Sequence, residues 1–551
     1  MSVAHMSDAT LDTLFQLVGT DRATIGEMFR ARCKITPDAV FLIWEGKRWT
    51  YADAWREAKT FALAVAASAT GGSVCGMRVA TYLPNRPEAF FVALGVQVAG
   101  AVYVPLNRQH KGVLLADMLA RSSPQLVVAD QNSSTDLSEA LPDGSQLLLV
   151  TEDDAELLGS TKPTISYSSA MSSAVSTSAD MFHIPGASDT AIIMYTSGTT
   201  GRSKAVLLPH AMFTRGGAYL ADAFGYQSDD VLHAWMPHFH IAGQLHTLCA
   251  AIVSGAAIAL FPTFSASRFW NQIADTGATA FSALPNVLAI LENAPPMATD
   301  SSNTLRVGLA GMLTEETRER FERRFGVTLY DQYGMTEVEP VTLPLKSRRV
   351  PSGSAGVAGP DYEITILDVD DMEQPAGALG EICVRPLHPD VMMKSYEGDS
   401  DTTVAQWRNL WWHTGDLGSI DSDGFIYVRG RIKHMIRRRG ENISSAELES
   451  ILAQHPNVAD CAAVGIPSPL GDEDVKAVLV PGAGEVIDPV AFHTWCAARM
   501  AHFMVPRFIE IRDELPYSGI GKVDKNLLKL AHGALWDAET VTHKQPLERQ
   551  L

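Results

Sequence analysis

The sequence predicts an α/β protein with a large N-terminal domain of layered, mostly parallel sheets flanked by helices, and a small α+β C-terminal domain. Three observations lead to this fold class. The chain has 551 residues, which is too long for one hydrophobic core. Short apolar runs typical of strands alternate with longer patterns typical of helices. Near residue 431 the pattern changes to a compact mixture of both, so we expect two domains, 1–431 and 432–551.

The alternation runs through most of the first domain. The predicted strands are Val79–Leu83, Ala101–Pro105, Leu147–Thr151, Ala191–Tyr195, Ala256–Phe261, Ala278–Leu284 and Val327–Tyr330, with an amphipathic helix at Arg86–Ala99. The serine-rich stretch Thr164–Asp180 is predicted to be a surface linker. Polar residues and glycines interrupt the apolar segment Ile241–Phe261, which favours a core helix and strand over a membrane span. A very basic run after Val428 precedes a predicted helix at Ala446–Leu452.

Composition argues against several classes of protein. The net charge of −19 disfavours a nucleic-acid partner, because its phosphates would be repelled. Six scattered cysteines without metal-binding spacing are typical of reduced thiols rather than of a disulfide framework. The first twenty residues lack the pattern of a signal peptide, and we expect no transmembrane segment. We therefore expect a cytoplasmic protein.

The most informative segment directly follows the predicted strand Ala191–Tyr195. It consists of Thr196, Ser197, Gly198, Thr199, Thr200, Gly201, Arg202, Ser203 and Lys204. Glycines let the backbone fold closely around an anion, hydroxyl and N–H groups donate to its oxygens, and the lysine adds positive charge. The spacing differs from that of the P-loop. The segment predicts a polyphosphate-binding loop, with an ordinary flexible loop as the alternative.

Three further motifs are weak individually. Asp331–Glu337 follows an apolar strand and offers a ring, Tyr333, that can stack on a flat base and a carboxylate, Glu337, that can hold Mg²⁺. Asp416 follows a tight turn, where its carboxylate can accept hydrogen bonds from both ribose hydroxyls. Lys522 lies on a glycine-rich loop near the C-terminus. The alternative for the first two motifs is an ordinary turn, and the alternative for Lys522 is a lysine that faces solvent.

Taken in this order, the motifs resemble those of the acyl-adenylate-forming superfamily, which includes acyl-CoA synthetases, amino-acid adenylation domains and firefly-type luciferases. The resemblance extends from about Asp21 to Leu530. The loop Thr196–Lys204 is similar to the family's phosphate loop, although Ser203 and Ala205 stand where proline and glycine are usual.

The resemblance implies a role for each matching residue. Nucleotide binding is implied for Thr196, Ser197, Gly198, Thr199, Thr200, Gly201, Lys204, Gly311, Met312, Asp331, Gln332, Tyr333, Gly334, Thr336, Asp416 and Arg431. Glu337 matches the residue that binds Mg²⁺, and Lys522 matches the adenylation lysine. Lys433 falls on the hinge about which a small mobile C-terminal domain rotates, and Gly440 falls on a turn that approaches the thiol.

The implied reaction joins a carboxylic acid to coenzyme A in two steps. ATP and Mg²⁺ convert the carboxylate into an acyl-adenylate with release of pyrophosphate, and a thiol then attacks the adenylate and releases AMP. Lys522 would bridge the carboxylate and the α-phosphate in the first step, and rotation about Lys433 would remove it for the second.

The identity of the acid is less constrained. Pro237–Gln244 resembles the segment that lines the acyl pocket, where His240 matches an aromatic or histidine gate; a packed, hydrogen-bonded histidine is the alternative. An aspartate for a substrate amine is missing here, which disfavours amino-acid substrates. Met236–Ile241 and Arg268–Gln272 look most like crotonobetaine/carnitine–CoA ligases. Steroid, aromatic, short- and medium-chain acids stay open. So do transfer of the acyl group to a carrier protein or another acceptor, a non-catalytic nucleotide-binding protein and a homodimer.

Overall fold

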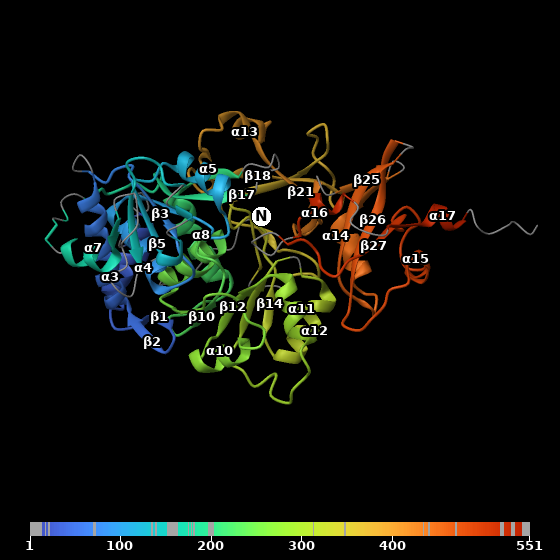
Figure 1. Ribbon diagram of the computed structural model, residues 1–551, viewed down its shortest axis with the longest axis horizontal. Coiled ribbons are helices and arrows are strands. Elements are labelled where there is room, and N and C mark those ends of the chain that lie inside the picture. Colours follow the sequence, from blue (N-terminus) through green and yellow to red (C-terminus); the bar gives the residue numbers. More distant parts are fainter. Residues whose placement is uncertain are drawn as a thin grey trace, which may run out of the picture. The chain divides into compact units, whose positions relative to one another are not determined.

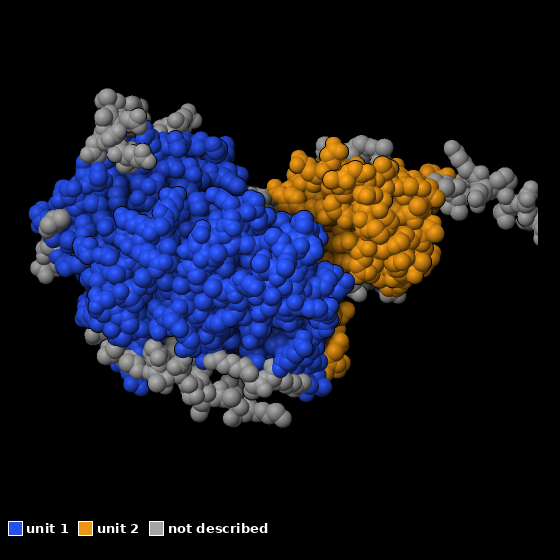
Figure 2. All heavy atoms as spheres, turned by 90° about the horizontal axis from the view of Figure 1, so that it is seen from below, with its two compact units in different colours: residues 1–364, 384–412, 421–427 blue, residues 365–383, 413–420, 428–551 orange. Residues whose placement is uncertain are grey.

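The computed structural model (Figure 1) describes residues 14–16, 18–19, 23–69, 73–133, 136–137, 140–150, 164–174, 176–177, 179, 182–196, 203–311, 313–345, 349–432, 435–438, 441–468, 471–517, 523–530 and 535–542. The chain forms two compact units. The first comprises residues 1–364, 384–412 and 421–427, and the second comprises residues 365–383, 413–420 and 428–551 (Figure 2). The domain division expected between residues 431 and 432 stays a prediction.

A seven-stranded sheet in the first unit has the order β14-β13-β12-β10-β11-β1-β2. Its strands are β1 (Val40–Trp44), β2 (Lys47–Thr50), β10 (Val231–Ala234), β11 (Ala257–Leu260), β12 (Ala280–Ala283), β13 (Val307–Ala310) and β14 (Thr328–Tyr330). All neighbours pair in parallel except the β1–β2 hairpin. The carboxyl ends of β10, β12, β13 and β14 therefore meet at one edge of this sheet.

An eight-stranded sheet in the same unit has the order β19-β9-β8-β4-β3-β5-β6-β7. Its strands are β3 (Arg78–Tyr82), β4 (Val102–Pro105), β5 (Leu126–Asp130), β6 (Gln146–Val150), β7 (Thr164–Ser166), β8 (Thr190–Thr196), β9 (Lys204–Pro209) and β19 (Ser395–Tyr396). The pairs from β8 to β7 are parallel, whereas β9 pairs antiparallel with β8 and β19. These two sheets confirm the predicted strands of the first domain and their mostly parallel pairing.

The helices of the first unit cover both sheets. They include α2 (Ile25–Ile35), α3 (Tyr51–Ser68), α4 (Pro87–Ala99), α5 (Gly112–Ser122), α8 (His210–Ala223), a π-helical segment η5 (Ala242–Cys249), α9 (Ala250–Ser254), α10 (Phe269–Thr276), α11 (Pro285–Asn293) and α12 (Glu315–Phe325). In Figure 1, α10, α11 and α12 lie beside the seven-stranded sheet. The predicted core helix and strand within Ile241–Phe261 are confirmed by η5, α9 and β11. Within the described ranges, no helix is both long and apolar enough to span a membrane.

The prediction of a surface linker at Thr164–Asp180 is wrong for its first eleven residues. They form strand β7 and helix α7 (Tyr167–Ala174). β7 extends the eight-stranded sheet by pairing in parallel with β6, and the ring of Tyr167 stacks on Phe61 with centroids 5.8 Å apart. Sheet pairing and the stacking of one half-buried ring therefore outweigh the loop preference of the serines.

A five-stranded sheet has the order β17-β18-β21-β20, with β22 paired to β21, and its strands contribute residues to both units. These strands are β17 (Tyr362–Leu367), β18 (Gly380–Pro386), β20 (Trp407–Arg408), β21 (Trp411–Ile420) and β22 (Ile426–Arg431). Smaller elements of the first unit are β15 (Thr342–Leu343), β16 (Val357–Ala358) and α13 (Ser400–Ala405).

The second unit has its own sheet and hydrophobic core. The sheet has the order β25-β26-β27-β28 and packs with helices around buried residues such as Leu448, Val475 and Phe492. Its elements are β23 (Met435–Arg438), β24 (Glu441–Ser444), α14 (Ser445–Leu452), β25 (Val458–Ser468), β26 (Gly471–Pro481), α15 (Pro489–Ala497), β27 (Phe508–Ile511), α16 (Lys525–Leu528), β28 (Leu535–Asp537) and α17 (Ala538–Thr542). Helix α14 confirms the helix predicted at Ala446–Leu452.

All six cysteines lie in the described part of the chain, and none forms a disulfide. Four are buried and one is half-buried, whereas Cys75 is exposed. Burial raises the pKa of the Cys33 and Cys496 thiols to about 12, which keeps them protonated and unreactive at neutral pH.

Candidate active site

The segments after β13 and β14 lie side by side at the carboxyl edge of the seven-stranded sheet. The two strands pair in parallel, with Gly308 opposite Leu329 and Leu309 opposite Tyr330. The backbone N–H of Leu313 donates to the Asp331 carboxylate over 2.8 Å and joins the two segments. The edge thus brings together Gly311, Asp331, Gln332, Tyr333, Gly334, Thr336 and Glu337, all predicted nucleotide or metal ligands. Ligands of α/β proteins commonly bind at such an edge. Met312 lies outside the described residues.

Gly334 lies against a buried carboxylate, Glu339, that is not among the predicted site residues. A Cβ atom built on Gly334 would lie 2.7 Å from Oε1 of Glu339 and closer still to Oε2. Glu339 is only 3% exposed. Its Oε1 accepts a hydrogen bond from Nε2 of Gln332 over 2.6 Å and lies 3.1 Å from Nε2 of His246. Gly334 is therefore required by packing inside the protein, before any nucleotide is considered.

Gly311 differs from Gly334 in its surroundings. A Cβ at Gly311 would meet only the backbone oxygen of Gln332, at an ordinary contact distance of 3.7 Å. The protein itself therefore has room for a side chain at this position. If Gly311 is needed, the need comes from a bound molecule, as its predicted position against adenine implies.

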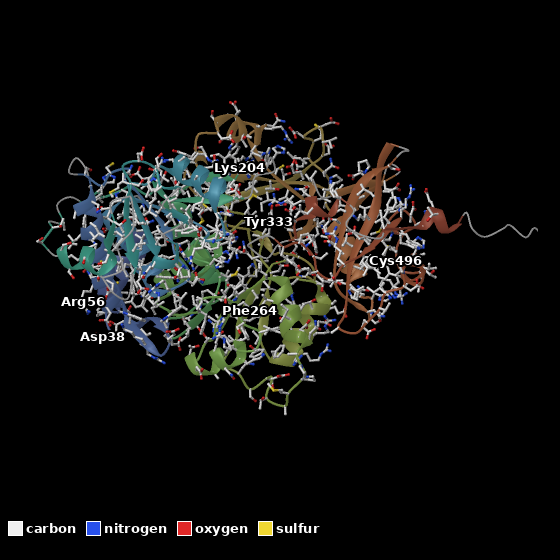
Figure 3. The ribbon with its side chains drawn as sticks, in the orientation of Figure 1. Asp38, Arg56, Lys204, Phe264, Tyr333 and Cys496 are labelled. Atoms are coloured by element: carbon white, nitrogen blue, oxygen red, sulfur yellow. The ribbon has the colours of Figure 1, made fainter. Side chains whose placement is uncertain are left out.

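The predicted phosphate loop connects two paired strands. Thr196 ends β8 and Lys204 begins β9, and the two residues are opposite each other in the antiparallel ladder. Ser197, Gly198, Thr199, Thr200 and Gly201 lie outside the described residues. The Lys204 ammonium stands 4.4 Å from the centroid of the Tyr396 ring, within the range of a cation–π interaction. Lys204 and Tyr333 are labelled in Figure 3.

Glu337, the predicted magnesium ligand, is half-buried. The hydroxyl of Tyr396 donates a hydrogen bond to its Oε1 over 2.8 Å. Among the described residues, no hydrogen bond reaches the second oxygen, Oε2. A carboxylate with one oxygen held and the other open is the hard oxygen ligand that Mg²⁺ prefers, so the residues present fit this ion. Tyr396 was not among the predicted site residues.

Asp416 and Arg431, the predicted ribose contacts, form an ion pair within the second unit. Nε of Arg431 lies 2.6 Å from Oδ1 of Asp416. The arginine side chain is 42% exposed, whereas that of the aspartate is 7% exposed. The arginine can therefore leave the pair for a ligand at little cost, while the aspartate stays fixed.

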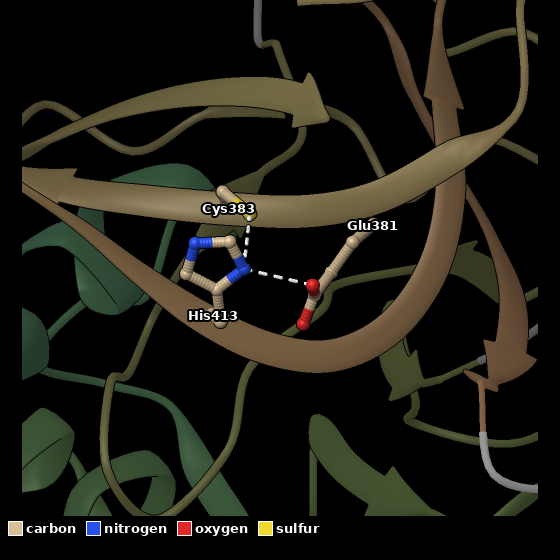
Figure 4. Close-up of side chains that lie close together, drawn as sticks. All are labelled: Glu381, Cys383 and His413. Carbon is tan, nitrogen blue, oxygen red and sulfur yellow. Dashed lines mark hydrogen bonds and ion pairs between the residues drawn. The ribbon is translucent and has the colours of Figure 1, made fainter. Parts of the chain in front are cut away.

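A buried cluster holds the turn that precedes Asp416. Glu381 accepts a hydrogen bond from the backbone N–H of Gly415 over 2.8 Å with one oxygen, and its other oxygen lies 2.8 Å from Nδ1 of His413. The Cys383 sulfur lies 3.4 Å from the same nitrogen (Figure 4). Gly415 has φ of +72°, a conformation that favours glycine. The 2.8 Å separations are those of charge-assisted hydrogen bonds, so the cluster braces the turn that presents Asp416.

The segment after β10 contains His240, the predicted gate. His240 is half-buried, and its Nδ1 accepts a hydrogen bond from the backbone N–H of Ala242 over 3.3 Å, at the start of η5. Asn85, after β3, fixes the segment by donating to the carbonyls of Trp235 and Met236 over 3.1 and 3.0 Å. Its Oδ1 accepts from the His238 N–H over 2.9 Å. His240 is thus half-buried and hydrogen-bonded, as the alternative interpretation expects. Its role as a gate stays a prediction.

Three further predicted site residues, Lys433, Gly440 and Lys522, lie outside the described residues. The structure brings the remaining ones together in two groups. The first unit joins the phosphate-loop lysine to the predicted magnesium ligand through Tyr396. The second unit joins Asp416 to Arg431. Glu339, His246 and Tyr396 were missed because a single carboxylate, imidazole or phenol outside a motif gives no signal in one sequence.

Comparison with known proteins agrees with this reading. The family model of the AMP-binding enzymes matches residues 29–396, and that of the AMP-binding enzyme C-terminal domain matches residues 447–522. The crotonobetaine/carnitine–CoA ligase of Salmonella enteritidis is 35% identical over 475 residues, covering 82% of this chain and 88% of the relative.

Two solved structures extend the comparison to the fold. ATP-bound MatB from Rhodopseudomonas palustris superposes with a TM-score of 0.82 at 25% identity, over 92% of this chain and 98% of that one. The o-succinylbenzoate CoA synthetase of Bacillus subtilis, in complex with its acyl-adenylate, superposes with a TM-score of 0.78 at 25% identity over the same shares of the two chains. These matches confirm the predicted family and fold class.

Proposed function

The chain belongs to the AMP-binding enzyme family and is an AMP-forming acyl-CoA synthetase, and from this premise we propose the roles of its residues and the class of its acid. One observation supports the assignment of the site above all: Lys204 and Glu337 both contact Tyr396, the lysine through the ring and the carboxylate through the hydroxyl. Residues far apart in the sequence thereby place a positive charge for phosphate and a carboxylate for Mg²⁺ next to each other.

The first step needs a carboxylate oxygen to attack the α-phosphorus of ATP while pyrophosphate leaves. We assign Lys204, with the loop before it, to binding the phosphate oxygens, and Glu337 to holding Mg²⁺. The ion, when bound, neutralises charge on the phosphates. Lys522 is assigned to bridging the acid carboxylate and the α-phosphate. The protein's contribution is positioning and charge stabilisation rather than covalent catalysis.

The adenosine part of ATP is assigned to two sets of residues. Gly311 and the segment Asp331–Gly334 offer backbone and a ring to adenine, and Asp416 offers a fixed, buried carboxylate to the ribose hydroxyls. Arg431, whose side chain is 42% exposed, can turn from Asp416 to the nucleotide. The second step requires Lys522 to withdraw and the thiol of coenzyme A to enter, and we assign the hinge to Lys433 and the approaching turn to Gly440.

For the acid, we propose a small carboxylate with a cationic or apolar tail. Half-buried aromatic side chains, Trp235, Phe239 and Phe264, lie on or near the segment after β10, and the rings of Trp235 and Phe264 are 5.4 Å apart. Aromatic faces attract quaternary ammonium groups. The named substrates of the Salmonella relative, crotonobetaine and carnitine, carry such a group, so they come first among the candidates.

The proposal is tested by two assays on the purified full chain. Acid-dependent exchange of labelled pyrophosphate into ATP measures the first step over a panel of betaine, fatty, aryl and steroid acids. Release of AMP is then measured with and without coenzyme A for each active acid. We expect exchange with at least one small acid and AMP release that depends on coenzyme A. Exchange without such dependence would point instead to a carrier protein as the acceptor.

A further inference from the structure

Tyr396 touches both charged groups that the proposed ATP site depends on. Its hydroxyl donates to Glu337 Oε1 over 2.8 Å, and its ring face lies 4.4 Å from the ammonium of Lys204. The residue is only 4% exposed. A phenol at this place therefore serves a carboxylate with its polar end and a cation with its ring.

The backbone around Tyr396 is attached to both motifs. On one side, the N–H of Met393 donates to the carbonyl of Glu337 over 2.8 Å. On the other, β19 pairs antiparallel with β9, and the N–H groups of Lys394 and Glu397 donate to the carbonyls of Leu207 and Ala205, each over 2.8 Å. This short strand is a bridge between the end of the phosphate loop and the segment that carries Glu337.

The backbone of Tyr396 is also held from the direction of α13. The backbone N–H of Tyr396 donates to Oγ1 of Thr403 over 3.0 Å, and that hydroxyl donates in turn to the carbonyl of Asp399 over 2.9 Å. Three separate segments therefore fix the backbone from which the ring extends. An aromatic residue that merely filled space would not need its hydroxyl aimed at a carboxylate with one open oxygen.

We propose that Tyr396 is a positioning residue that couples the phosphate-binding lysine to the magnesium-binding carboxylate. The proposal rests on the function proposed above. By occupying Oε1, the hydroxyl leaves Oε2 of Glu337 as the oxygen for Mg²⁺ and fixes its direction. Mutation of a residue that hydrogen-bonds to a metal ligand commonly lowers metal affinity or activity by about 10- to 100-fold. The ring, through Lys204, contributes to binding of the phosphates even without the ion.

The test is calorimetric titration of the full-length protein with ATP, once with excess Mg²⁺ and once with EDTA, so that no turnover is involved. Tyr396→Phe removes the hydroxyl and keeps the ring. We expect its affinity for Mg²⁺–ATP to fall by roughly 10- to 100-fold, with metal-free ATP binding within about twofold of wild type. Tyr396→Leu also removes the ring, and we expect a further loss of roughly two- to fivefold in metal-free ATP binding.

Tyr51→Phe is the matched control. The Tyr51 hydroxyl is also buried, and its one hydrogen is shared between the carbonyls of Ala251 and Ala256, each 2.9 Å away, among core residues that have no proposed role. We expect Tyr51→Phe to lower the melting temperature and to leave the ratio of the two ATP affinities unchanged. A general loss of stability and a loss of metal coupling are thereby separated.

A double variant distinguishes loss of the Tyr396–Glu337 contact from general misfolding. In a Glu337→Gln background the carboxylate is gone, so adding Tyr396→Phe should change Mg²⁺–ATP affinity by less than about twofold. An unchanged Mg²⁺–ATP affinity in Tyr396→Phe alone, or equal losses with and without Mg²⁺, would overturn the proposal. Failure of the proposed function is a different result: the wild-type protein would then bind ATP and show no pyrophosphate exchange with any acid.

Discussion

Replacing Gly334 by alanine tests whether this glycine serves the protein or the nucleotide. The added Cβ would lie 2.7 Å from Oε1 of Glu339 and closer to Oε2, whereas ordinary contacts begin at 3.4 Å. The buried carboxylate would have to retreat by more than the difference, 0.7 Å. Because Oε2 lies closer still, the whole carboxylate must move, and its hydrogen bonds with Gln332 and His246, now 2.6 and 3.1 Å long, would be stretched to the limit of hydrogen-bond length or beyond it.

The expected loss follows from those two bonds. A hydrogen bond to a charged group contributes about 1.5–3 kcal/mol, and leaving the buried carboxylate unsatisfied forfeits that amount. Gly334→Ala should therefore lower the free energy of unfolding by roughly 3–6 kcal/mol without any ligand. Gly311→Ala is the matched control, because its Cβ would make only one ordinary contact. We expect it to change stability by less than about 0.5 kcal/mol and to weaken ATP binding roughly tenfold by crowding adenine.

Urea unfolding of each variant, followed by tryptophan fluorescence, measures the stability, and titration with ATP measures the binding. A double-mutant cycle sharpens the result. In a Glu339→Ala background the clash is absent, so Gly334→Ala should cost less than about 1 kcal/mol there. Equal costs of Gly334→Ala with and without the Glu339 carboxylate would refute the reasoning. So would a Gly334→Ala protein as stable as the wild type.

Three further predictions concern the two half-reactions and acid stability. Lys522→Ala should abolish pyrophosphate exchange and spare much of the thioester formation from supplied acyl-adenylate; equal loss of both would contradict its role. Lys433→Pro, which fixes φ at the hinge, should slow thioester formation more than exchange, and an unchanged ratio of the two rates would remove the hinge. Burial lowers the pKa of His210 and His238 to about 3 and that of His233 to about 4, whereas an exposed histidine in the unfolded chain has a pKa near 6.5. Below about pH 6.5 the unfolded chain therefore binds more protons than the folded one. Stability should fall as pH falls, by about 4 kcal/mol between pH 7 and 5.5, and a flat urea midpoint over this range would count against it.

Most of the fold could be predicted because the parallel strands are buried on both faces. A strand such as β6 is a run of apolar residues, and its signal survives in a single sequence. The same physics explains the failure at Thr164–Asp180. β7 has only three residues and lies at the edge of its sheet, so its pairing with β6 is decided by partner residues 17 positions earlier in the chain rather than by its own composition.

The site could be predicted where glycines and charges crowd into a motif, as from Thr196 to Lys204. Residues that act through these motifs were not predictable. Tyr396 belongs to a two-residue strand, and its importance comes from the register of β19 against β9. Glu339 was not predictable either, because its contact with Gly334 exists only in the folded structure, and that contact is the reason why position 334 needs a glycine. The sequence shows that the motif contains Gly334, but only the structure shows why a glycine is needed there.

The exposure of Cys75 gives the protein a single accessible place for a chemical label. The other five thiols are buried or half-buried, so a maleimide dye reacts with Cys75 first, in the first unit. Val486, in the second unit, is 81% exposed and can be replaced by cysteine for a second dye. Energy transfer between the two dyes then reports the separation of the units as ATP, an acid and coenzyme A are added in turn. One substitution thus turns the proposed rotation about Lys433 into a distance that can be followed in real time.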